Sequence, residues 1–467
     1  MSDQTAAAAA PDAAPMRARV LALLRQHGWN ATSFQVLEPG FSYWFDDEAC
    51  VAYVDTGRAW VAAGAPITVE AQLGAVARAF VAAARAAGRG ACFFATEQRF
   101  ATLSGFRHLL IGEQPVWEPA RWSETLRATP SLREQLRRAR AKGVSVSEVP
   151  SSELSDPGAP LRREIEALIA HWQRSKAMPP MGFLVHVEPF GFADERKFFV
   201  ARLGAGVEAR VVGFAAVVPV YARGGWFLED LIRAPSAPNG TVELLVDAVS
   251  GAALRLGSAY LTLGLSPLSG DVAPALGLAR RYAAPLYDFA GLRGFKAKLR
   301  PQRWAPIYLS HPDETSALGA VVESLRAFAR RGLLRYGFDA VLRGPTIVVR
   351  ALAWLLLPWT VLLATLDERW FPALWVHWAW VGFDVALFAA LHALGRQFRA
   401  WLSRGVVIAV TLDALITLGQ ALAFNLPRSS NAREALGLGV AVAAPAIASR
   451  ILAQAHARVI AVAPLGR

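Results

Sequence analysis

The chain has 467 residues, 54% of them hydrophobic, and a formal net charge of +12 at neutral pH. This length allows two or three domains, each large enough to bury its own core. The two cysteines, Cys50 and Cys92, exclude a disulfide framework and lack metal-ligand spacing, so we expect a reducing cytoplasm and no metal.

The first 15 residues have neither the basic start nor the apolar core of a secretory signal, and we expect a disordered tail. Residues 16–150 then alternate strand and helix signals. "CVAYVDTG", "AWVAAGAPI" and "GACFFATE" predict strands, and "EAQLGAVARAFVAAARAAG" predicts a helix that ends at a glycine. The segment 131–143, "SLREQLRRARAKG", predicts a capped helix with five basic residues and one acid.

Residues 151–312 repeat this theme. "PLRREIEALIAHWQRS" and "GTVELLVDAVSGAALRLG" predict helices, and "RKFFVARLG", "ARVVGFAAVVPVYA" and "AYLTLGL" predict strands. A run of strands, a helix from the centre of the sheet and further strands are typical of GNAT-type acyltransferases. The order occurs twice, so we predict an α+β tandem GNAT-like fold with subdomains 16–150 and 151–312, the second catalytic, and a helical linker 313–344.

The remaining segment, 345–467, holds ten arginines, five acids and no lysine. Its four apolar runs are 347–366, 371–394, 405–426 and 435–453. Each has about the 20 residues that a helix needs to cross a bilayer, so we predict an all-α membrane domain of about four transmembrane helices. Arginine-rich segments before the first run and after the second predict a multi-pass inner-membrane protein whose large N-terminal part faces the cytoplasm.

Two acids, Asp384 and Asp413, lie near the middle of the second and third apolar runs. A carboxylate at that depth is unfavourable unless it is paired or faces a polar cavity. We expect pairing with Arg350 or Arg450, in preference to a path for a lipid headgroup.

The most unusual stretch is "LEDLIRAPSAPNGTVELL", where a predicted strand gives way to a predicted helix. A helix N-terminus at the centre of a split sheet offers unpaired N–H groups and can bind an anion. Pro238 fixes the approach, Asn239 and Gly240 allow the backbone to come close to a phosphate, and Thr241 is the expected helix cap.

The chain resembles the synthase domain of the lysylphosphatidylglycerol synthases, also called multiple peptide resistance factors. The matching pieces are "MGFLVHVEPF", "VVGFAAVVPV", "EDLIRAPSAPNGTVELLV", "YLTLGLSPLSG" and "LYDFAGLRGFKAKLRPQRWAPIYL", with a looser match in the first half. The resemblance implies transfer of an aminoacyl group from aminoacyl-tRNA to a hydroxyl of phosphatidylglycerol or a related anionic lipid. The sequence departs from the family at Ala65, where Gly-Asp-Pro is usual.

Under this resemblance, Asp230 and Arg233 match the family's Asp-x-x-Arg. Asp230 would hold the α-ammonium of the aminoacyl group or orient the lipid hydroxyl, and Arg233 would bind phosphate. The alternative is a local ion pair that shapes the loop. Glu243, one turn into the helix, is a further catalytic candidate, although it also interacts favourably with the helix dipole. Glu229 is expected to be a neighbour of the site.

The segment "GLRGFKAKLRP" supplies four cations for substrate binding: Arg293, Lys296, Lys298 and Arg300. Read as an extended segment, it places Lys296, Lys298 and Arg300 on one face, where a polyanion would balance them. The alternative is a solvated edge strand. Tyr287 can donate a hydrogen bond to the substrate or belong to the core.

The basic helix 131–143 is the expected tRNA-binding surface, although such a charge run is often only a solvated face. Its cations are Arg133, Arg137, Arg138, Arg140 and Lys142. No GxSxG motif or Ser/Cys–His arrangement occurs, so we expect direct attack without a covalent enzyme intermediate and without a cofactor. The alternatives are an acyl-CoA-dependent acyltransferase, although the usual glycine-rich phosphate loop is absent from the sequence, and a non-enzymatic membrane scaffold.

Overall fold

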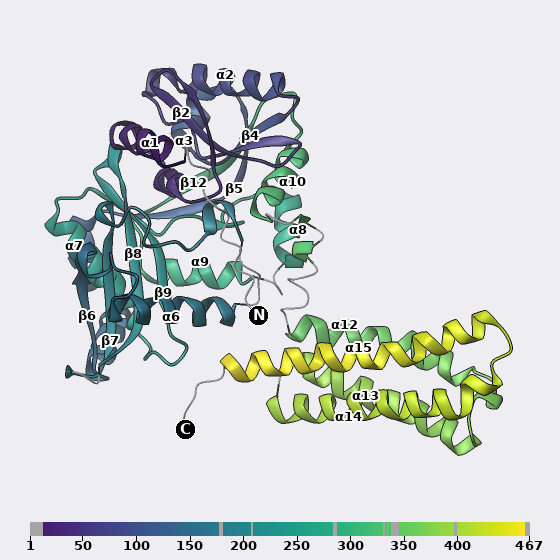
Figure 1. Cartoon of the computed structure of the whole chain (residues 1–467). Coiled ribbons are helices and arrows are strands. Elements are labelled where there is room, and N and C mark those ends of the chain that lie inside the picture. Colours follow the sequence, from purple (N-terminus) through teal and green to yellow (C-terminus); the bar gives the residue numbers. More distant parts are fainter. Residues whose placement is uncertain are drawn as a thin grey trace. The chain divides into compact units, whose positions relative to one another are not determined.

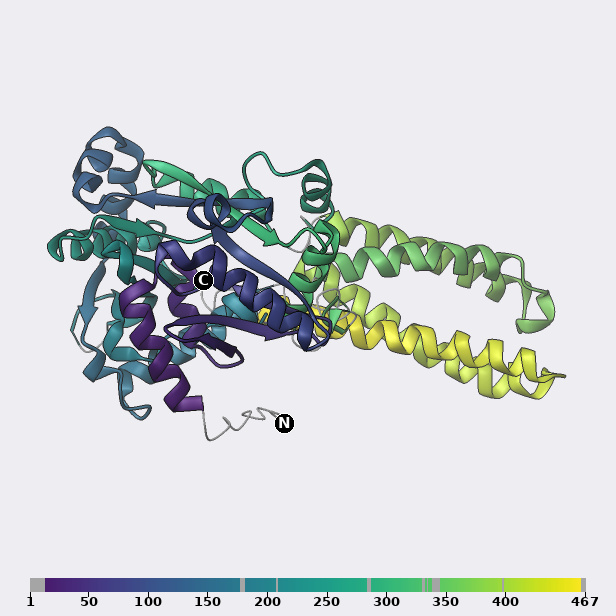
Figure 2. The same cartoon turned by 90° about the horizontal axis from the view of Figure 1, so that it is seen from above.

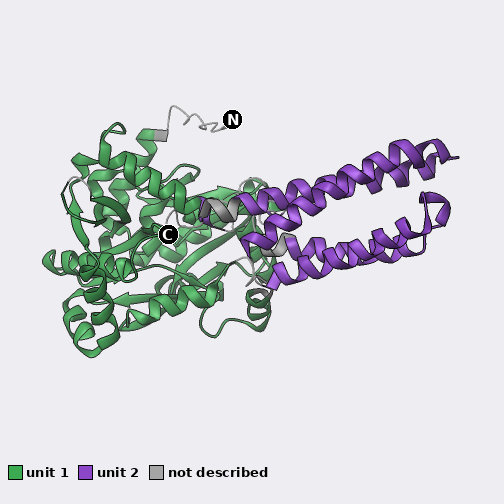
Figure 3. Cartoon of the chain, turned by 90° about the horizontal axis from the view of Figure 1, so that it is seen from below, with its two compact units in different colours: residues 1–173, 180–333 green, residues 174–179, 334–467 purple. Residues whose placement is uncertain are grey.

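The structure is a computed structural model that describes residues 13–176, 181–206, 209–283, 287–329, 332–333, 335–337, 345–396 and 399–462. Residues 1–12 of the expected tail and 338–344 of the expected linker lie outside this range. The chain divides into two compact units, 1–173 with 180–333, and 174–179 with 334–467 (Figure 3). Each unit is described by itself below.

A mixed sheet runs through the first unit in the order β1-β2-β3-β4-β12-β5-β10-β9-β8-β7-β6, with β11 paired to β5 (Figure 1). The strands are β1 Ser42–Asp46, β2 Ala49–Asp55, β3 Ala59–Ala63, β4 Gly90–Glu97, β5 Arg107–Trp117, β6 Val144–Val149, β7 Lys197–Leu203, β8 Arg210–Val220, β9 Gly225–Arg233, β10 Tyr260–Thr262, β11 Ser266–Pro267 and β12 Arg303–His311. The helices are α1 Ala13–His27, α2 Leu73–Ala86, α3 Gln98–Ser104, α4 Trp122–Ala128, α5 Pro130–Ala141, α6 Pro160–Ser175, α7 Thr241–Arg255, α8 Pro274–Ala283, α9 Phe289–Lys298 and α10 Ala317–Phe328.

The same order of elements occurs twice in this sheet. Strands β1 to β3 form an antiparallel meander, and helix α2 then leads to β4, which is parallel to β3. Strands β6 to β9 form a second antiparallel meander, and helix α7 leads to β10, which is parallel to β9. This repetition confirms the predicted α+β tandem GNAT-like fold.

Strand β12 joins the two halves. It is the last strand of the second half, yet it lies between β4 and β5 of the first half and pairs antiparallel with both. Both halves therefore contribute to one continuous sheet.

Strands β9 and β10 separate at the centre of the sheet. Their last paired residues are Phe227 and Thr262, and β9 continues to Arg233 without β10. Gly264 has a φ of +67°, and a Cβ atom there would lie 2.7 Å from the Phe227 ring. The glycine therefore lets the chain turn away against the aromatic ring, which leaves the C-terminal part of β9 unpaired on this side.

Apolar side chains cover both faces of the second half of the sheet. On one face, Phe214 and Ile232 pack with residues of α6. On the other, Val217 and Leu228 pack with residues of α5 and α7. The alternation of side chains along a strand thus assigns successive β8 and β9 residues to different helical layers.

The long described helices of the second unit are α12 Pro345–Ala364, α13 Leu374–Arg396, α14 Ala400–Gln420 and α15 Ala432–Val462. They run lengthwise beside one another (Figure 2), and α15 contacts both α14 and α12. Three stretches in the described chain, 374–396, 400–428 and 432–457, are long and apolar enough to cross a membrane. The first expected span gives a shorter apolar helix, Val349–Ala364.

The pairing expected for the two membrane aspartates is wrong. Arg350 donates from Nε to the carbonyl oxygen of Gly395 at 3.0 Å, and Arg450 is exposed. Within the described helices, neither arginine forms a salt bridge with Asp384 or Asp413. Arg350 binds α13 at Gly395, eleven residues beyond Asp384, and Arg450 is exposed although the neighbouring Ser449 contacts Thr411 of α14.

Candidate functional site

A cluster of buried charged side chains lies where β9 separates from β10. Glu229 and Asp230 come from β9, Glu38 from the residue after the 3₁₀ helix Ala31–Leu37, and Arg196 from the residue before β7. We call Glu38, Glu229, Asp230 and Arg196 the acid cluster. Its members come from both halves of the sheet, so the sequence gives no local sign of it.

A β-bulge brings two adjacent carboxylates of β9 into the cluster. Ala216 of β8 pairs with Asp230, whereas Val217 pairs with Leu228, so Glu229 is an extra residue without a partner in the ladder. In a regular strand, adjacent side chains point to opposite faces. The bulge interrupts this alternation, so the negative charges of both Glu229 and Asp230 affect Glu38.

The acid cluster is almost entirely removed from solvent. Glu38 and Asp230 are 4% and 7% exposed, and Arg196 and Glu229 form a buried salt bridge. Burial, and then the neighbouring Glu229 carboxylate, raise the pKa of both Glu38 and Asp230. The Arg196 guanidinium opposes this effect, but one cation faces three carboxyl groups.

Several carboxylate oxygens of the cluster are buried without a hydrogen-bond partner in the described chain. They are both oxygens of Glu38, Oε1 of Glu229 and Oδ2 of Asp230. Buried polar atoms normally have partners, so unsatisfied atoms in one place indicate a missing binding group. A group that carries positive charge and several N–H donors, such as an ammonium, fits this arrangement.

Arg233 lies on the opposite face of β9 from Asp230. Beyond the bulge, Asp230, Leu231, Ile232 and Arg233 pair in regular register, and an odd spacing places the two charged residues on different faces. Arg233 is half-buried, and its guanidinium has no hydrogen-bond or ion-pair partner among the described residues. The local ion pair considered from the sequence therefore does not form.

The turn before α7 packs against protein rather than opening toward a ligand. Gly240 is the N-cap residue with a φ of +95°, and a Cβ atom there would lie 2.4 Å from the Gln135 carbonyl oxygen of α5. Thr241 is not the cap as predicted, because its hydroxyl donates to the Pro238 carbonyl oxygen at 2.7 Å. The glycine serves the contact between α5 and α7.

Asn239 and Glu243 flank this turn. Asn239 is exposed and Glu243 is half-buried in the first turn of α7. Neither side chain forms a hydrogen bond with another residue of the described part of the chain. Both remain available to a ligand at the helix N-terminus, and Glu243 stays a candidate without geometric support for catalysis.

The segment "GLRGFKAKLRP" is helical, so its expected extended conformation is wrong. Asp288 caps α9 by accepting from the Gly291 N–H group. Residues two apart on a helix point in nearly opposite directions, and accordingly Lys296 is buried while Lys298 is exposed. Arg300 lies beyond the helix with a φ of +52° and is exposed. The three cations do not share one face.

Lys296 is bound by the backbone at the separation of β9 and β10. Its Nζ atom donates to the carbonyl oxygens of Leu263, Gly264 and Leu265 at 2.8, 2.9 and 3.0 Å. Burial lowers the pKa of Lys296 to about 7. The three acceptors match the three donors of an ammonium, so Lys296 holds the turn that follows β10.

Arg293 and Tyr287 have protein partners. Arg293 lies 3.4 Å from a carboxylate oxygen of Glu113, and its guanidinium lies 4.7 Å from the centre of the Trp304 ring. The Tyr287 ring packs 4.8 Å from that of Phe289, and burial raises the pKa of Tyr287. These contacts favour structural roles for both residues.

The basic helix α5 is exposed but partly neutralised. Arg137 and Arg138 pair with Glu134 on the same helix, and Arg140 lies 2.8 Å from Asp247 of α7. Arg133 donates to backbone carbonyl oxygens, and Lys142 is exposed. Five cations face two acids, so a positive surface remains.

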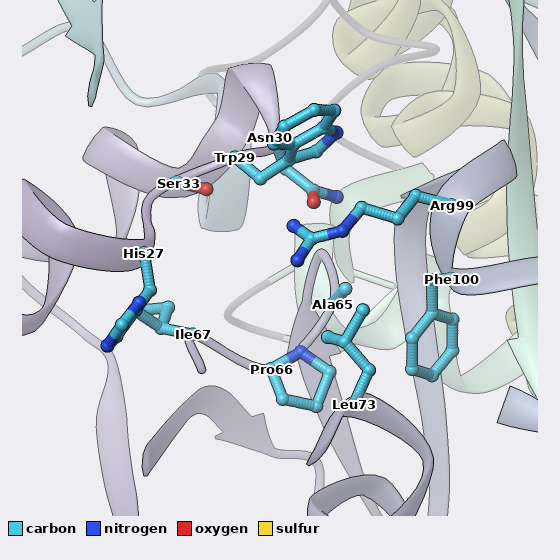
Figure 4. Close-up of a pocket in the computed structure, with 10 residues that line it drawn as sticks. All are labelled: His27, Trp29, Asn30, Ser33, Ala65, Pro66, Ile67, Leu73, Arg99 and Phe100. Atoms are coloured by element: carbon cyan, nitrogen blue, oxygen red, sulfur yellow. The ribbon is translucent and has the colours of Figure 1, made fainter. Parts of the chain in front are cut away.

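A small pocket in the first half is lined in part by Ala65, the residue at which the sequence departs from the family's usual Gly-Asp-Pro. Figure 4 shows its lining residues, with the Arg99 guanidinium directed into the space between Asn30 and Ala65. Arg99 lies over the Trp29 ring at 4.6 Å and pairs with Glu70. The pocket measures about 10 Å³, which suits one water molecule and not a substrate.

A second buried ion pair, between Glu97 and Arg223, was also missed from sequence. Glu97, at the end of β4, and Arg223 approach to 2.7 Å, and the Arg223 guanidinium lies over the Tyr260 ring at 3.7 Å. Tyr260 begins β10, so this contact joins the central strands of the two halves. Among the described residues, no group of three or more His, Cys, Asp or Glu is arranged to hold a metal ion.

Comparisons with known proteins extend this description. A family model described as "Phosphatidylglycerol lysyltransferase, C-terminal" matches residues 21–311. A phosphatidylglycerol lysyltransferase of Bacillus subtilis (strain 168) is 30% identical over 117 residues, which cover 23% of this chain and 14% of that protein. The chain thus spans a small part of the length of the curated relative that it matches.

Two solved structures share the fold. L-PGS from Bacillus licheniformis is 21% identical, with a TM-score of 0.57, and the match covers 67% of this chain and 97% of that one. The C-terminal domain of a putative lysylphosphatidylglycerol synthetase from Agrobacterium fabrum is also 21% identical, with a TM-score of 0.56 and coverage of 67% and 96%. Because its family model covers more than half of the sequence, the chain belongs to the phosphatidylglycerol lysyltransferase C-terminal domain family.

Proposed function

We propose that the first unit transfers an aminoacyl group from aminoacyl-tRNA to a hydroxyl of phosphatidylglycerol or a related anionic lipid. One observation supports this assignment most strongly: four buried carboxylate oxygens of the acid cluster lack partners within the described residues. An aminoacyl group carries an α-ammonium, and a lysyl group carries a second ammonium on its side chain. Family membership supplies the lipid class.

The acid cluster would bind the donor through its ammonium. When empty, Glu38 and Asp230 hold protons because burial disfavours their charged forms. An arriving ammonium compensates the negative charge, so the carboxyl groups release protons as it binds. The cluster then fixes the position of the adjacent ester carbonyl.

The transfer is a transesterification. The lipid hydroxyl oxygen attacks the ester carbonyl carbon, the bond to the tRNA ribose oxygen breaks, and the proton of the lipid hydroxyl passes to that ribose oxygen. Both sides of the reaction are esters, so proximity and stabilisation of the tetrahedral oxyanion are the main requirements. Arg233, a half-buried cation without a partner in the described chain, lies on the opposite face of β9 from Asp230, so it is suited to a phosphate of the lipid or of the tRNA 3′ end that is bound on that other face.

The second unit would hold the transferase at the membrane that contains its acceptor. Its long apolar helices fit this role, and retention beside the lipid raises the effective concentration of the acceptor. The arginine-rich segments before α12 and between α13 and α14 favour a cytoplasmic position for the first unit, where charged tRNA occurs.

The test is reconstitution of the full chain in phosphatidylglycerol vesicles with lysyl-tRNA, alanyl-tRNA or acyl-CoA as separate donors. We expect a new aminoacyl lipid by mass spectrometry with an aminoacyl-tRNA donor. Asp230→Asn should abolish it, while Glu153→Gln, which changes an exposed acid, should not. Product with acyl-CoA alone would replace the proposal by the acyl-CoA alternative, and no product with any donor would favour the scaffold.

A further inference from the structure

The interior of the membrane-helix bundle is polar along one half of its length, whereas the described part of the other half is mainly apolar, with Ser403 and His456 bonded to each other near its end. On α13, the buried positions His377 and Asp384 are followed by Leu387, Leu391 and Leu394. These positions recur every three or four residues, so they lie on one face of the helix. That face changes from polar to apolar directly after Asp384.

Helix α14 shows the same change in the opposite chain direction. Its buried Val406 and Val410 are followed by Asp413, Thr417 and Gln420. The sequence then continues through one π-helical turn, Ala421–Asn425, which buries Asn425. Helices α13 and α14 follow one another with a short connection and contact each other, so the polar start of α13 lies beside the polar end of α14.

Hydrogen bonds connect several of these polar residues. Thr417 donates to Asp413 at 3.0 Å, and Trp380 donates to Gln420 at 3.1 Å. Gln420 and Asn425 donate to the Trp370 carbonyl oxygen at 3.2 and 3.1 Å. We call this set, with His377, the polar lane. It leads from the 365–373 connection to the two aspartates.

The aspartates end the lane at mid-bundle. Asp384 is the last polar residue of the buried α13 face, Asp413 is the first acid of α14 before Thr417, and these two helices contact each other. Beyond them, Val349 and Ala353 of α12 pack with Leu391, Val410 and other apolar residues, including Leu452 of α15. The lane is therefore closed on one side by an apolar core.

Buried polar atoms without partners mark this lane. Asp384 is 5% exposed, and its Oδ2 atom has no hydrogen-bond partner in the described helices. Nδ1 of His377 and Oδ1 of Asn425 are likewise buried and unpaired there. An acid at this depth without a cationic partner is unfavourable in its charged form, and π-helical turns frequently occur at functional sites.

We infer that Asp384 and Asp413 form a proton-binding site inside the bundle, reached through the polar lane from the end that carries residues 365–373. A proton neutralises one carboxylate and converts it to a hydrogen-bond donor for the other. The amide, hydroxyl, indole and imidazole groups of the lane provide acceptors and donors along which a proton can move. The inference is independent of the transferase activity.

Other charged groups of the described bundle do not balance the negative charge of Asp384 and Asp413. On α12, Arg350 is bound to the Gly395 carbonyl oxygen. On α13, His377 donates from Nε2 to the Leu363 carbonyl oxygen. On α15, Arg450 is exposed, and His456 bonds to Ser403 of α14 at the apolar end.

The test is infrared difference spectroscopy of the full chain in lipid nanodiscs. We expect a carboxylic acid C=O band at pH 6, above the ordinary pKa values of Asp and Glu, that is lost in Asp384→Asn with Asp413→Asn. Glu38 and Asp230 also hold protons, so the band is read as the difference between wild type and this double variant. Asp367→Asn, which changes an exposed acid in the same unit, is the matched control and should keep the band.

Two further experiments test which ion binds at the aspartates and by which route it reaches them. If the C=O band disappears at constant pH when Na⁺ replaces K⁺, the site binds a metal cation, and the inference that it binds a proton is wrong. Gln420→Leu with Asn425→Leu should retain the band but slow its hydrogen–deuterium exchange, whereas Leu391→Met in the apolar half should not. An unchanged band in the aspartate double variant, or unchanged exchange in the lane variant, would contradict the inference.

Discussion

The Lys296 Nζ atom lies 2.8 Å from the Leu263 carbonyl oxygen, one residue beyond the end of β10. The carbonyl oxygens of Gly264 and Leu265 also accept hydrogen bonds from this Nζ atom. The lysine is a buried cation at the separation of β9 and β10, and unlike Arg196 it holds the turn there without contacting a carboxylate.

Replacing this lysine tests its structural role. Lys296→Met removes the donors of three buried carbonyl groups, and we expect a loss of about 3 kcal/mol in the free energy of unfolding, since each unsatisfied group costs about 1–3 kcal/mol. Lys298→Met, two residues away and exposed, should be nearly neutral. Thermal unfolding of both variants gives the comparison; equal melting temperatures would contradict the role.

The pH dependence of this effect has a defined sign. The pKa of Lys296 is lowered to about 7 in the folded protein, below the ordinary lysine value of about 10.4. Between these pH values the unfolded chain binds more protons, so this lysine makes stability rise with pH. The wild type should therefore gain stability relative to Lys296→Met as pH rises through this range, and equal slopes in the two proteins would assign the dependence to other groups.

The acid cluster predicts a pH-dependent affinity for the donor. The pKa values of Glu38 and Asp230 are raised by burial, so the carboxyl groups are protonated at low pH and bind an ammonium poorly. We expect KM for aminoacyl-tRNA to fall as pH rises. The same raised pKa values make the native state bind more protons, so stability should fall as pH rises from the ordinary carboxyl range.

Glu38→Gln keeps the shape of the side chain and removes its charge. We expect kcat/KM to drop by about 10–100-fold, corresponding to one charged hydrogen bond of about 1.5–3 kcal/mol, and the pH dependence of KM to flatten. Glu48→Gln, in an exposed turn of the same half, is the control. A Glu38→Gln enzyme with unchanged KM at every pH would remove the cluster from substrate binding.

The contact between α5 and α7 can be tested at Gly240. Gly240→Ala forces a positive φ on alanine and places its Cβ 2.4 Å from a backbone oxygen, so the unfolding free energy should fall by more than 2 kcal/mol, roughly the strain of the φ angle alone. Gly257→Ala has a φ of +67° but open space around its Cβ. It should therefore cost only about 1–2 kcal/mol, and equal losses in the two variants would contradict the close approach.

The basic surface of α5 predicts salt-dependent tRNA binding. Reversing Arg137 and Arg138 to Glu should weaken binding and flatten its dependence on salt, because each lost phosphate contact lowers the slope. Arg127→Glu on α4 is the matched change of an exposed arginine. Binding isotherms at several salt concentrations give the slopes; an unchanged slope in the α5 variant would leave this helix as a solvated face.

Local sequence patterns predicted the fold but not the acid cluster. The strand–helix order of each half follows from hydrophobic periodicity, and "PNGT" identified the turn before α7. Glu38 and Arg196 lie far apart in sequence and meet Asp230 only after the two halves share a sheet. No local pattern of residue types marks such a long-range contact.

The extended reading of "GLRGFKAKLRP" failed for a different reason. Alternating cations resemble one face of a strand, but Asp288 caps a helix and the buried Lys296 finds backbone acceptors instead of a polyanion. Similarly, Gly240 was read as a phosphate contact because a glycine before a helix permits any close approach. Here the approaching group is the Gln135 carbonyl of α5.

The position of β12 has a consequence for synthesis on the ribosome. Strands β4 and β5 emerge early, but the strand between them ends at His311 and emerges only after both halves have been translated. The facing edges of β4 and β5 therefore have no strand between them until then, and after α10 the next long helices to emerge are the hydrophobic ones. Completion of the sheet and synthesis of the hydrophobic helices are thus close in time.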